Sequence, residues 1–144
     1  MTYVLNGTPE DIRRIEKGTA ILFQELHLGP KESDLQIEVL FQDTETLSTT
    51  KEGNTIRIKC RETAHYFRGL NWILHHLDKD SVQKEEPVIF PKNGYMLDCS
   101  RNSVFTVEKV KSLIRILAKL GMNDLLLYTE DTYEVPEEPY FGTY

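Results

Sequence analysis

The chain has 144 residues and a mass of 16.7 kDa, with 23 acidic and 17 basic side chains, a net charge of −6 and a pI near 5.2. This length indicates one domain, or one domain and a piece of a second, and a hydrophobic content of 40% excludes an intrinsically disordered chain and a collagen-like repeat. The acidic balance argues against nucleic acid as a partner, because phosphate neutralisation requires clustered Lys and Arg.

Neither the cysteines nor the N-terminus resembles those of a secreted or membrane protein. Cys60 and Cys99 are the two thiols of the sequence, too few for a disulfide framework or a cysteine-rich zinc site, and both are predicted to be reduced core residues. Residues 1–7 lack the basic and apolar segments of a signal peptide, and no apolar run approaches the ~18 residues of a membrane span. We therefore expect a soluble, cytoplasmic chain with no membrane partner.

The first half of the chain predicts a small sheet covered by two helices. A helix should begin at Thr8-Pro9, where an N-cap residue precedes proline and two acids. A strand is expected over residues 35–41, and a hairpin with its turn at 51–54 supplies two more strands. A second helix follows over 63–77. The order strand, helix, strand, strand, strand, helix indicates an α+β layer with both helices on its covered face.

The second half has a different pattern. Residues 78–87 are polar, charged and closed by proline, which predicts a linker. A strand over 95–97, a helix over 106–120 and an apolar strand over 124–128 then predict a βαβ unit. The last strand should be buried on both faces, as parallel strands are. Two strands cannot supply that burial and residues 129–144 do not complete the sheet, so the chain is expected to be truncated.

The helix of this βαβ unit has one apolar and one basic side. Its apolar residues are expected to face inward, and its basic residues should face outward (Val107, Val110, Leu113, Ile114 and Leu117 against Lys109, Lys111, Arg115 and Lys119).

Candidate site residues follow the two predicted parallel strands, because ligands bind beyond the carboxyl ends of such strands. Arg101 could present its donors to hydroxyls or to a carboxylate, or it could simply pair with Asp98 or be solvated. Glu130 and Asp131 could hold a sugar hydroxyl, a metal ion or a proton, or they could form a solvated acidic loop.

Other chemical motifs are absent from the sequence. The four histidines have no carboxylate at a metal-ligand spacing, so they are interpreted as surface or core residues. The sequence contains neither a glycine-rich phosphate loop nor a G-x-S-x-G motif. We therefore expect no cofactor and no metal.

Four segments of the second half, residues 94–102, 120–123, 127–134 and 139–142, resemble glycoside hydrolase family 20, which contains the β-N-acetylhexosaminidases. The first half is similar to the small α/β domain that precedes the catalytic barrel in that family. The expected fold is α+β, a small antiparallel sheet with two helices on one face, followed by the truncated βαβ start of a (β/α)8 barrel. The expected domains are 1–86 and 87–144, and the second is expected to be truncated because a complete barrel needs ~250 residues.

The resemblance also implies site residues. In the family, the arginine shortly after the first barrel strand binds hydroxyls of the terminal sugar, and Arg101 is the matching position, with Asp98 as its orienting neighbour. The catalytic acid/base glutamate and the aspartate before it come after a later strand and are not expected in this chain. Glu130 and Asp131 occur in the reverse order after the second strand, so those catalytic roles are not assigned to them. Many members have a histidine-rich motif after the second strand, where this chain has residues 128–131. The resemblance therefore implies that this chain belongs to a distinct subgroup.

The activity implied for the full-length protein is exo-acting hydrolysis of terminal β-linked N-acetylglucosamine or N-acetylgalactosamine. The substrate's own acetamido oxygen would be the nucleophile and the configuration would be retained. The partner of the whole enzyme is thus an amino-sugar glycoside, and the 144-residue chain alone is expected to be inactive. The alternative is a stand-alone α/β module that binds a protein partner. Self-association through an exposed apolar face is plausible under both hypotheses.

Overall fold

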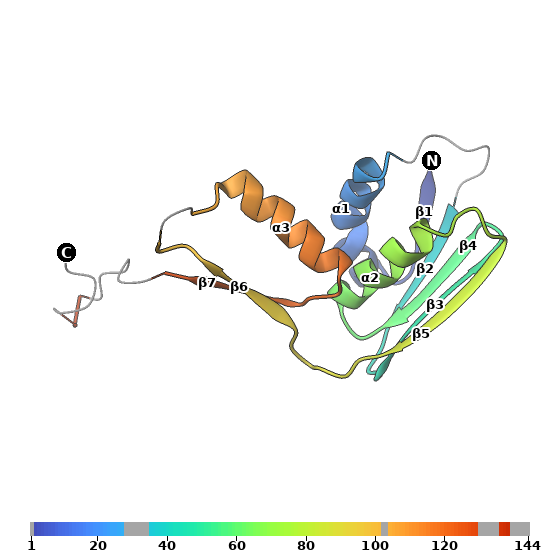
Figure 1. Cartoon of the computed structure of the whole chain (residues 1–144). Helices are drawn as coiled ribbons and strands as arrows, with labels where there is room; N and C mark the ends of the chain where they lie inside the picture. The colour runs from blue at the N-terminus through green and yellow to red at the C-terminus, as the bar shows by residue number, and fades with distance from the viewer. Residues whose placement is uncertain (1, 28–34, 102–103, 130–135, 139–144) are drawn as a thin grey trace.

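A computed structural model describes residues 2–27, 35–101, 104–129 and 136–138. The elements in Figure 1 are β1 (Tyr3–Asn6), α1 (Pro9–Glu25), β2 (Leu35–Phe41), β3 (Thr46–Glu52), β4 (Thr55–Cys60), α2 (Thr63–Leu74), β5 (Ser81–Pro87), β6 (Gly94–Asp98), α3 (Val107–Lys119) and β7 (Asp124–Tyr128). We call β1 to β5 with α1 and α2 the sheet unit, and β6, α3 and β7 the βαβ unit.

The sheet unit has a mixed sheet with the strand order β1-β2-β4-β3-β5. Strand β2 is parallel to both β1 and β4, whereas β3 is antiparallel to β4 and β5. The prediction of an antiparallel sheet was therefore wrong. Helix α1 crosses from β1 to β2, which makes that pair parallel. Strand β3 skips one position, and β4 turns back into the gap, so β4 runs in the same direction as β2.

The predicted linker over residues 78–87 was also wrong, because Ser81–Pro87 form the edge strand β5. Every second residue of β5, beginning with Val82, is turned toward the helix-covered face, and Val82 packs against the core. The other inward positions carry charged side chains, so the alternation is hard to recognise in the sequence. Charged residues and a terminal proline suit an edge strand, because they discourage pairing with another chain.

Both helices of the sheet unit begin where the sequence predicts, and the predicted hairpin forms between β3 and β4. The side chain of Thr8 caps α1 by accepting a hydrogen bond from the backbone N–H of Asp11 at 3.2 Å. The hairpin between β3 and β4 turns through Gly53, whose φ of +55° favours glycine. Helices α1 and α2 cover the same face of the sheet (Figure 1).

The core lies between that face and the two helices, and its buried apolar side chains come from α1, three strands and α2. They are Ile15, Leu22, Phe23, Leu35, Ile37, Val39, Leu47, Ile56, Ile58, Cys60, Tyr66, Leu70, Ile73 and Leu74. The buried hydroxyl of Tyr66 lies 3.0 Å from Thr19 Oγ1, so these two polar groups satisfy each other inside the core.

The predicted βαβ unit is confirmed: β6 and β7 are parallel and joined by α3. Figure 1 shows this pair of strands reaching away from the sheet unit. The expected burial of the second strand on both faces is not found among the described residues, because Leu126 is 57% exposed and Leu127 50% exposed. The described part of the chain supplies no further strand to this sheet.

The predicted faces of helix α3 are right in part: Val110 and Leu113 are half-buried and Leu117 is buried, whereas Lys109 and Lys111 are exposed. Arg115 and Lys119, expected to point outward, both form ion pairs with Glu25 of α1. Val107, expected to point inward, is 70% exposed, whereas Leu117 is buried. The outward prediction for Arg115 and Lys119 was wrong because one side of the carboxyl-terminal half of α3 lies against α1 and α2.

Both cysteines are free thiols; Cys60 is fully buried as predicted, but Cys99 is only half-buried. No helix in the described ranges is long and apolar enough to cross a bilayer.

Candidate functional site

The carboxyl ends of β6 and β7 lie side by side and carry the residues that the sequence analysis selected. Asp98 is in register with Tyr128, the last residue of β7. One residue further, the backbone N–H of Cys99 donates to the carbonyl of Tyr128 at 2.8 Å. The segment from Asp98 to Arg101 is thus held beside the end of the neighbouring strand.

The carboxylate of Asp98 organises this edge. Its Oδ1 atom accepts hydrogen bonds from the backbone N–H of Ser100 at 2.9 Å and from the hydroxyl of Ser100 at 2.7 Å. Its Oδ2 atom accepts one from Nη1 of Arg101 at 2.7 Å. The two bonds from Ser100, and then the guanidinium, hold the pKa of Asp98 well below its usual range. Asp98 is therefore an acceptor, not a proton donor, at neutral pH.

The guanidinium of Arg101 is held on two sides. Asp98 binds its Nη1 atom, and its central carbon lies 5.6 Å from the centroid of the Tyr128 ring, within cation–π range. Its side chain is nevertheless 61% exposed. A planar group with five N–H donors in fixed directions is suited to hydroxyl and carboxylate groups of a ligand. The ion pair that the sequence left open is present, and it leaves Arg101 facing solvent at the strand ends.

The other predicted site residues are not part of this geometry. Glu130 and Asp131 lie outside the described residues. Among the described residues, no three His, Cys, Asp or Glu side chains come together in a group that could hold a metal ion. The ring Nδ1 atoms of His75 and His76 lie 2.7 and 2.8 Å from backbone carbonyls of α2, and His65 is buried.

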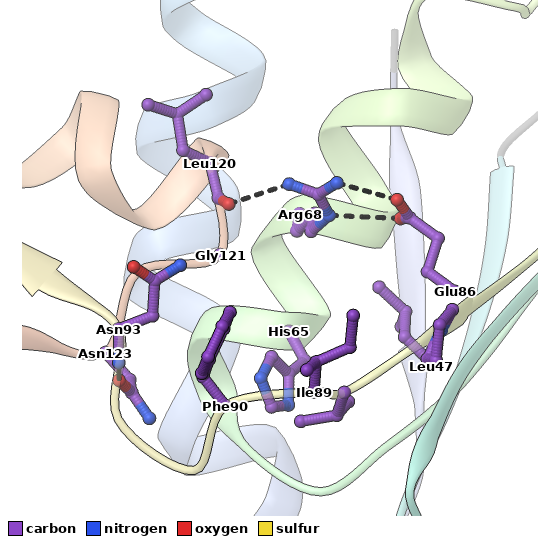
Figure 2. Close-up of a pocket in the computed structure, with 12 residues that line it drawn as sticks. Leu47, His65, Arg68, Glu86, Ile89, Phe90, Asn93, Leu120, Gly121 and Asn123 are labelled. Carbon is purple, nitrogen blue, oxygen red and sulfur yellow. Dashed lines mark hydrogen bonds and ion pairs between the residues drawn. The ribbon is translucent and has the colours of Figure 1, made fainter.

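A second cluster, which the sequence analysis missed, lies where the two units meet (Figure 2). A cavity of about 190 Å³ there is lined by residues of α2, β5, the segment before β6 and the end of α3. Arg68 forms a two-point ion pair with Glu86, with Nε–Oε2 and Nη2–Oε1 distances of 3.0 and 2.6 Å. Its Nη1 atom donates to the carbonyl of Leu120 at 2.8 Å. No sequence motif marks these residues, because Glu86 fell in the predicted linker and Arg68 on a helix surface.

Comparison with known proteins shows a fold but no close relative. No family model and no curated protein matches the chain. A GH20 β-N-acetylhexosaminidase from Streptomyces coelicolor A3(2) has a TM-score of 0.62 at 20% identity over 91% of this chain and 31% of its own. A GH20 exo β-N-acetylglucosaminidase from Vibrio harveyi has a TM-score of 0.61 at 20% identity, over 90% of this chain and 22% of its own.

A third solved structure with a similar fold is an enzyme from a different glycoside hydrolase family. A GH138 enzyme targeting pectin rhamnogalacturonan II has a TM-score of 0.63 at 12% identity, over 96% of this chain and 20% of its own. The chain therefore spans between a fifth and a third of the length of these three structures. At these identities the likeness establishes a mixed α/β fold found in glycoside hydrolases.

Proposed function

We propose that this chain is the N-terminal part of an exo-acting β-N-acetylhexosaminidase. The observation that carries the proposal is the Asp98–Arg101 pair at the carboxyl end of β6, the edge at which barrel enzymes bind their substrates. The fold shared with GH20 enzymes supports it. The substrate class is a terminal β-linked N-acetylglucosamine or N-acetylgalactosamine.

In this proposal Arg101 binds hydroxyls of the terminal sugar and Asp98 is a positioning residue. Asp98 fixes the guanidinium plane, and Ser100 in turn fixes the carboxylate. Glu130 and Asp131, which follow β7 in the sequence, are further candidates for contacts with sugar hydroxyls. Paired hydrogen bonds from a charged donor recognise hydroxyl orientation, so this edge would contribute to sugar selectivity.

The chemical step is assigned to groups outside these residues. The substrate's acetamido oxygen attacks the anomeric carbon and displaces the leaving oxygen, which a glutamic acid protonates. Water then attacks the same carbon and breaks its new bond to the acetamido oxygen, so the configuration is retained after two inversions. No Asp-Glu dipeptide occurs in the 144 residues. We therefore propose that the pair is supplied by further sequence of the full-length protein, and that the 144-residue chain alone does not hydrolyse glycosides.

The test uses the full-length protein and chromogenic N-acetyl-β-glucosaminide and N-acetyl-β-galactosaminide. Arg101→Lys is expected to lower kcat/KM by roughly 10- to 100-fold, the effect of losing hydrogen bonds from a charged group. Arg57→Lys is the control, because Arg57 lies on the far face of the sheet, paired with Glu38 and Glu52. Absence of turnover by the full-length protein, or equal activity of the two variants, would overturn the proposal.

One observation favours a second candidate, a stand-alone module that binds a protein partner. Met96, 59% exposed, is in register with Leu126, 57% exposed, on the neighbouring strand, and exposed apolar patches mark interfaces. An immunoblot of the source cells with an antibody against this chain separates the two hypotheses. A band above roughly 40 kDa, one small domain plus a barrel, supports the enzyme. A band near the 16.7 kDa of this chain supports the module.

A further inference from the structure

The surface of the sheet unit that contacts the βαβ unit is built from both of its helices. Glu25 of α1 receives Lys119 Nζ at 3.0 Å and Arg115 Nη1 at 3.4 Å, both from α3. Helix α2 contacts α3 along the same side. We infer that the sheet unit is the platform on which the βαβ unit folds, and that Arg68 is a central contact between them. This inference does not rest on the proposed function.

The βαβ unit has little burial of its own. A two-stranded sheet is marginally stable by itself, and most large apolar residues of β6, β7 and α3 are substantially exposed. In α3 the buried side chain is that of Leu117. Ala118 and Ile114 border an apolar groove whose other walls include Leu22 of α1 and Phe67 of α2. The packing that stabilises α3 therefore comes in large part from the sheet unit.

Arg68 joins three elements at one point. It projects from α2, binds both carboxylate oxygens of Glu86 on β5, and donates to the carbonyl of Leu120 at the end of α3. Lys84 Nζ lies 2.9 Å from Oε1 of Glu86, the oxygen that also binds Nη2 of Arg68. The carboxylate is thus held by two cations. Because the last carbonyls of a helix have no partner within the helix, this bond from a charged donor caps α3 with a side chain from the sheet unit.

The chain after α3 is shaped to fit over Arg68. Gly121 has a φ of +77°, and a Cβ atom at this position would lie 2.8 Å from Cδ of Arg68. Two residues later, the side-chain amide of Asn123 donates to Glu62 at 2.6 Å and to the carbonyl of Pro91 at 2.9 Å. The loop that leads into β7 is thus attached to the sheet unit at Arg68 and at the start of α2.

These attachments all lie at the amino ends of β6 and β7. The candidate site lies at their carboxyl ends, one strand length away, about 13–17 Å for five residues. The βαβ unit is therefore anchored at one end, and the Asp98–Arg101 edge is positioned through the strands. Loosening the anchor should release α3, β6 and β7 together while the core of the sheet unit stays folded.

The experiment is hydrogen exchange by mass spectrometry on the intact 144-residue chain. In Arg68→Met, exchange over residues 107–128 is expected to accelerate about tenfold or more relative to residues 35–60, since a hydrogen bond to a charged group is lost. The control is Arg57→Met: Arg57 also bonds carboxylates, and its side chain is 44% exposed against 41% for Arg68, but it faces away from α3.

A second pair of variants perturbs the joint from the other side. Gly121→Ala should accelerate exchange over 107–128 in the same way, because it combines backbone strain with pressure on Arg68. Gly53→Ala has a comparable φ of +55° but no atom within 4 Å of its new Cβ, and should leave 107–128 unchanged. Unchanged exchange in both Arg68→Met and Gly121→Ala would overturn the inference. Equal acceleration over 35–60 in Arg68→Met would also overturn it, because the sheet unit would then not be an independent platform.

Discussion

The ring of Phe67 occupies the space that a side chain at Gly18 would need. A Cβ atom at Gly18 would lie 2.3 Å from Cζ of Phe67, and two further ring atoms would lie within 3.1 Å. The same ring packs edge-on against Tyr66, with centroids 5.1 Å apart. Helices α1 and α2 thus approach closely because position 18 has no side chain.

Gly18→Ala should therefore destabilise the protein although alanine is the better helix former. The gain in helix propensity is about 1 kcal/mol, whereas overpacking costs about 1–3 kcal/mol. The expected net loss of unfolding free energy is up to about 2 kcal/mol, measured by urea denaturation. In a Phe67→Leu background the ring is gone and the same change should stabilise. If Gly18→Ala stabilises the protein with Phe67 intact, the close contact is not present.

The titration of Asp98 is a direct test of the candidate site. Hydrogen bonds from Ser100, backbone first and hydroxyl second, and then the Arg101 guanidinium lower its pKa. Because the folded-state pKa lies below the unfolded value of about 3.9, the stability that it contributes is present above that pH and is lost as the pH falls toward the folded value.

NMR titration of the carboxyl carbon should find Asp98 still ionised at the pH where an ordinary aspartate is half protonated. Ser100→Ala and Arg101→Met should each raise the pKa, since each removes one donor. A pKa for Asp98 that does not move in either variant would show that this network does not hold the carboxylate.

Local features of the fold could be predicted from the sequence because they depend on neighbouring residues. The cap at Thr8, the glycine turn at Gly53 and the βαβ order all follow from short-range patterns. Strand β5 was missed because Lys84 and Glu86 fill inward positions that usually hold apolar residues. Their charges are accommodated by partners distant in sequence, which a local pattern does not reveal.

The same distinction applies to the two clusters. Asp98 ends β6 and Arg101 follows three residues later, so an ion pair between them could be considered from the sequence. Arg68, Glu86 and Leu120 come from three elements, and they meet only because α3 docks on α2. Resemblance to a family directed attention to the strand ends, but it carried no information about this joint.

The two cysteines should differ in reactivity. Burial raises the pKa of the fully buried Cys60 to about 12, so only about one molecule in 10⁴ carries its thiolate at pH 8. Cys99 is half-buried at the end of β6. When the native protein is treated with a thiol-reactive disulfide reagent, one cysteine should therefore react rapidly. This rapid reaction should be absent in Cys99→Ser. In denaturant both thiols of the wild-type chain should react. Rapid labelling of native Cys99→Ser would show that Cys60 is accessible.

His65 should make the stability of the chain depend on pH. Its side chain is buried, and its Nδ1 atom has no hydrogen-bond partner among the described residues. Burial lowers the pKa of His65, with Arg61 and Arg68 acting in the same direction and Glu62 opposing them. The unfolded chain therefore binds a proton more readily than the folded one. The free energy of unfolding should fall as the pH drops through the unfolded value of about 6.5 and level off below the folded value.

His65→Leu removes this proton uptake and places an apolar side chain in the buried position. The stability of the variant relative to wild type should rise between about pH 8 and about pH 5, measured by urea denaturation at intermediate steps. His75→Leu is the control, because His75 is exposed at the opposite, carboxyl-terminal end of the same helix. A difference between His65→Leu and wild type that stays constant over this range would mean that His65 takes up its proton equally well in both states, and would contradict the prediction.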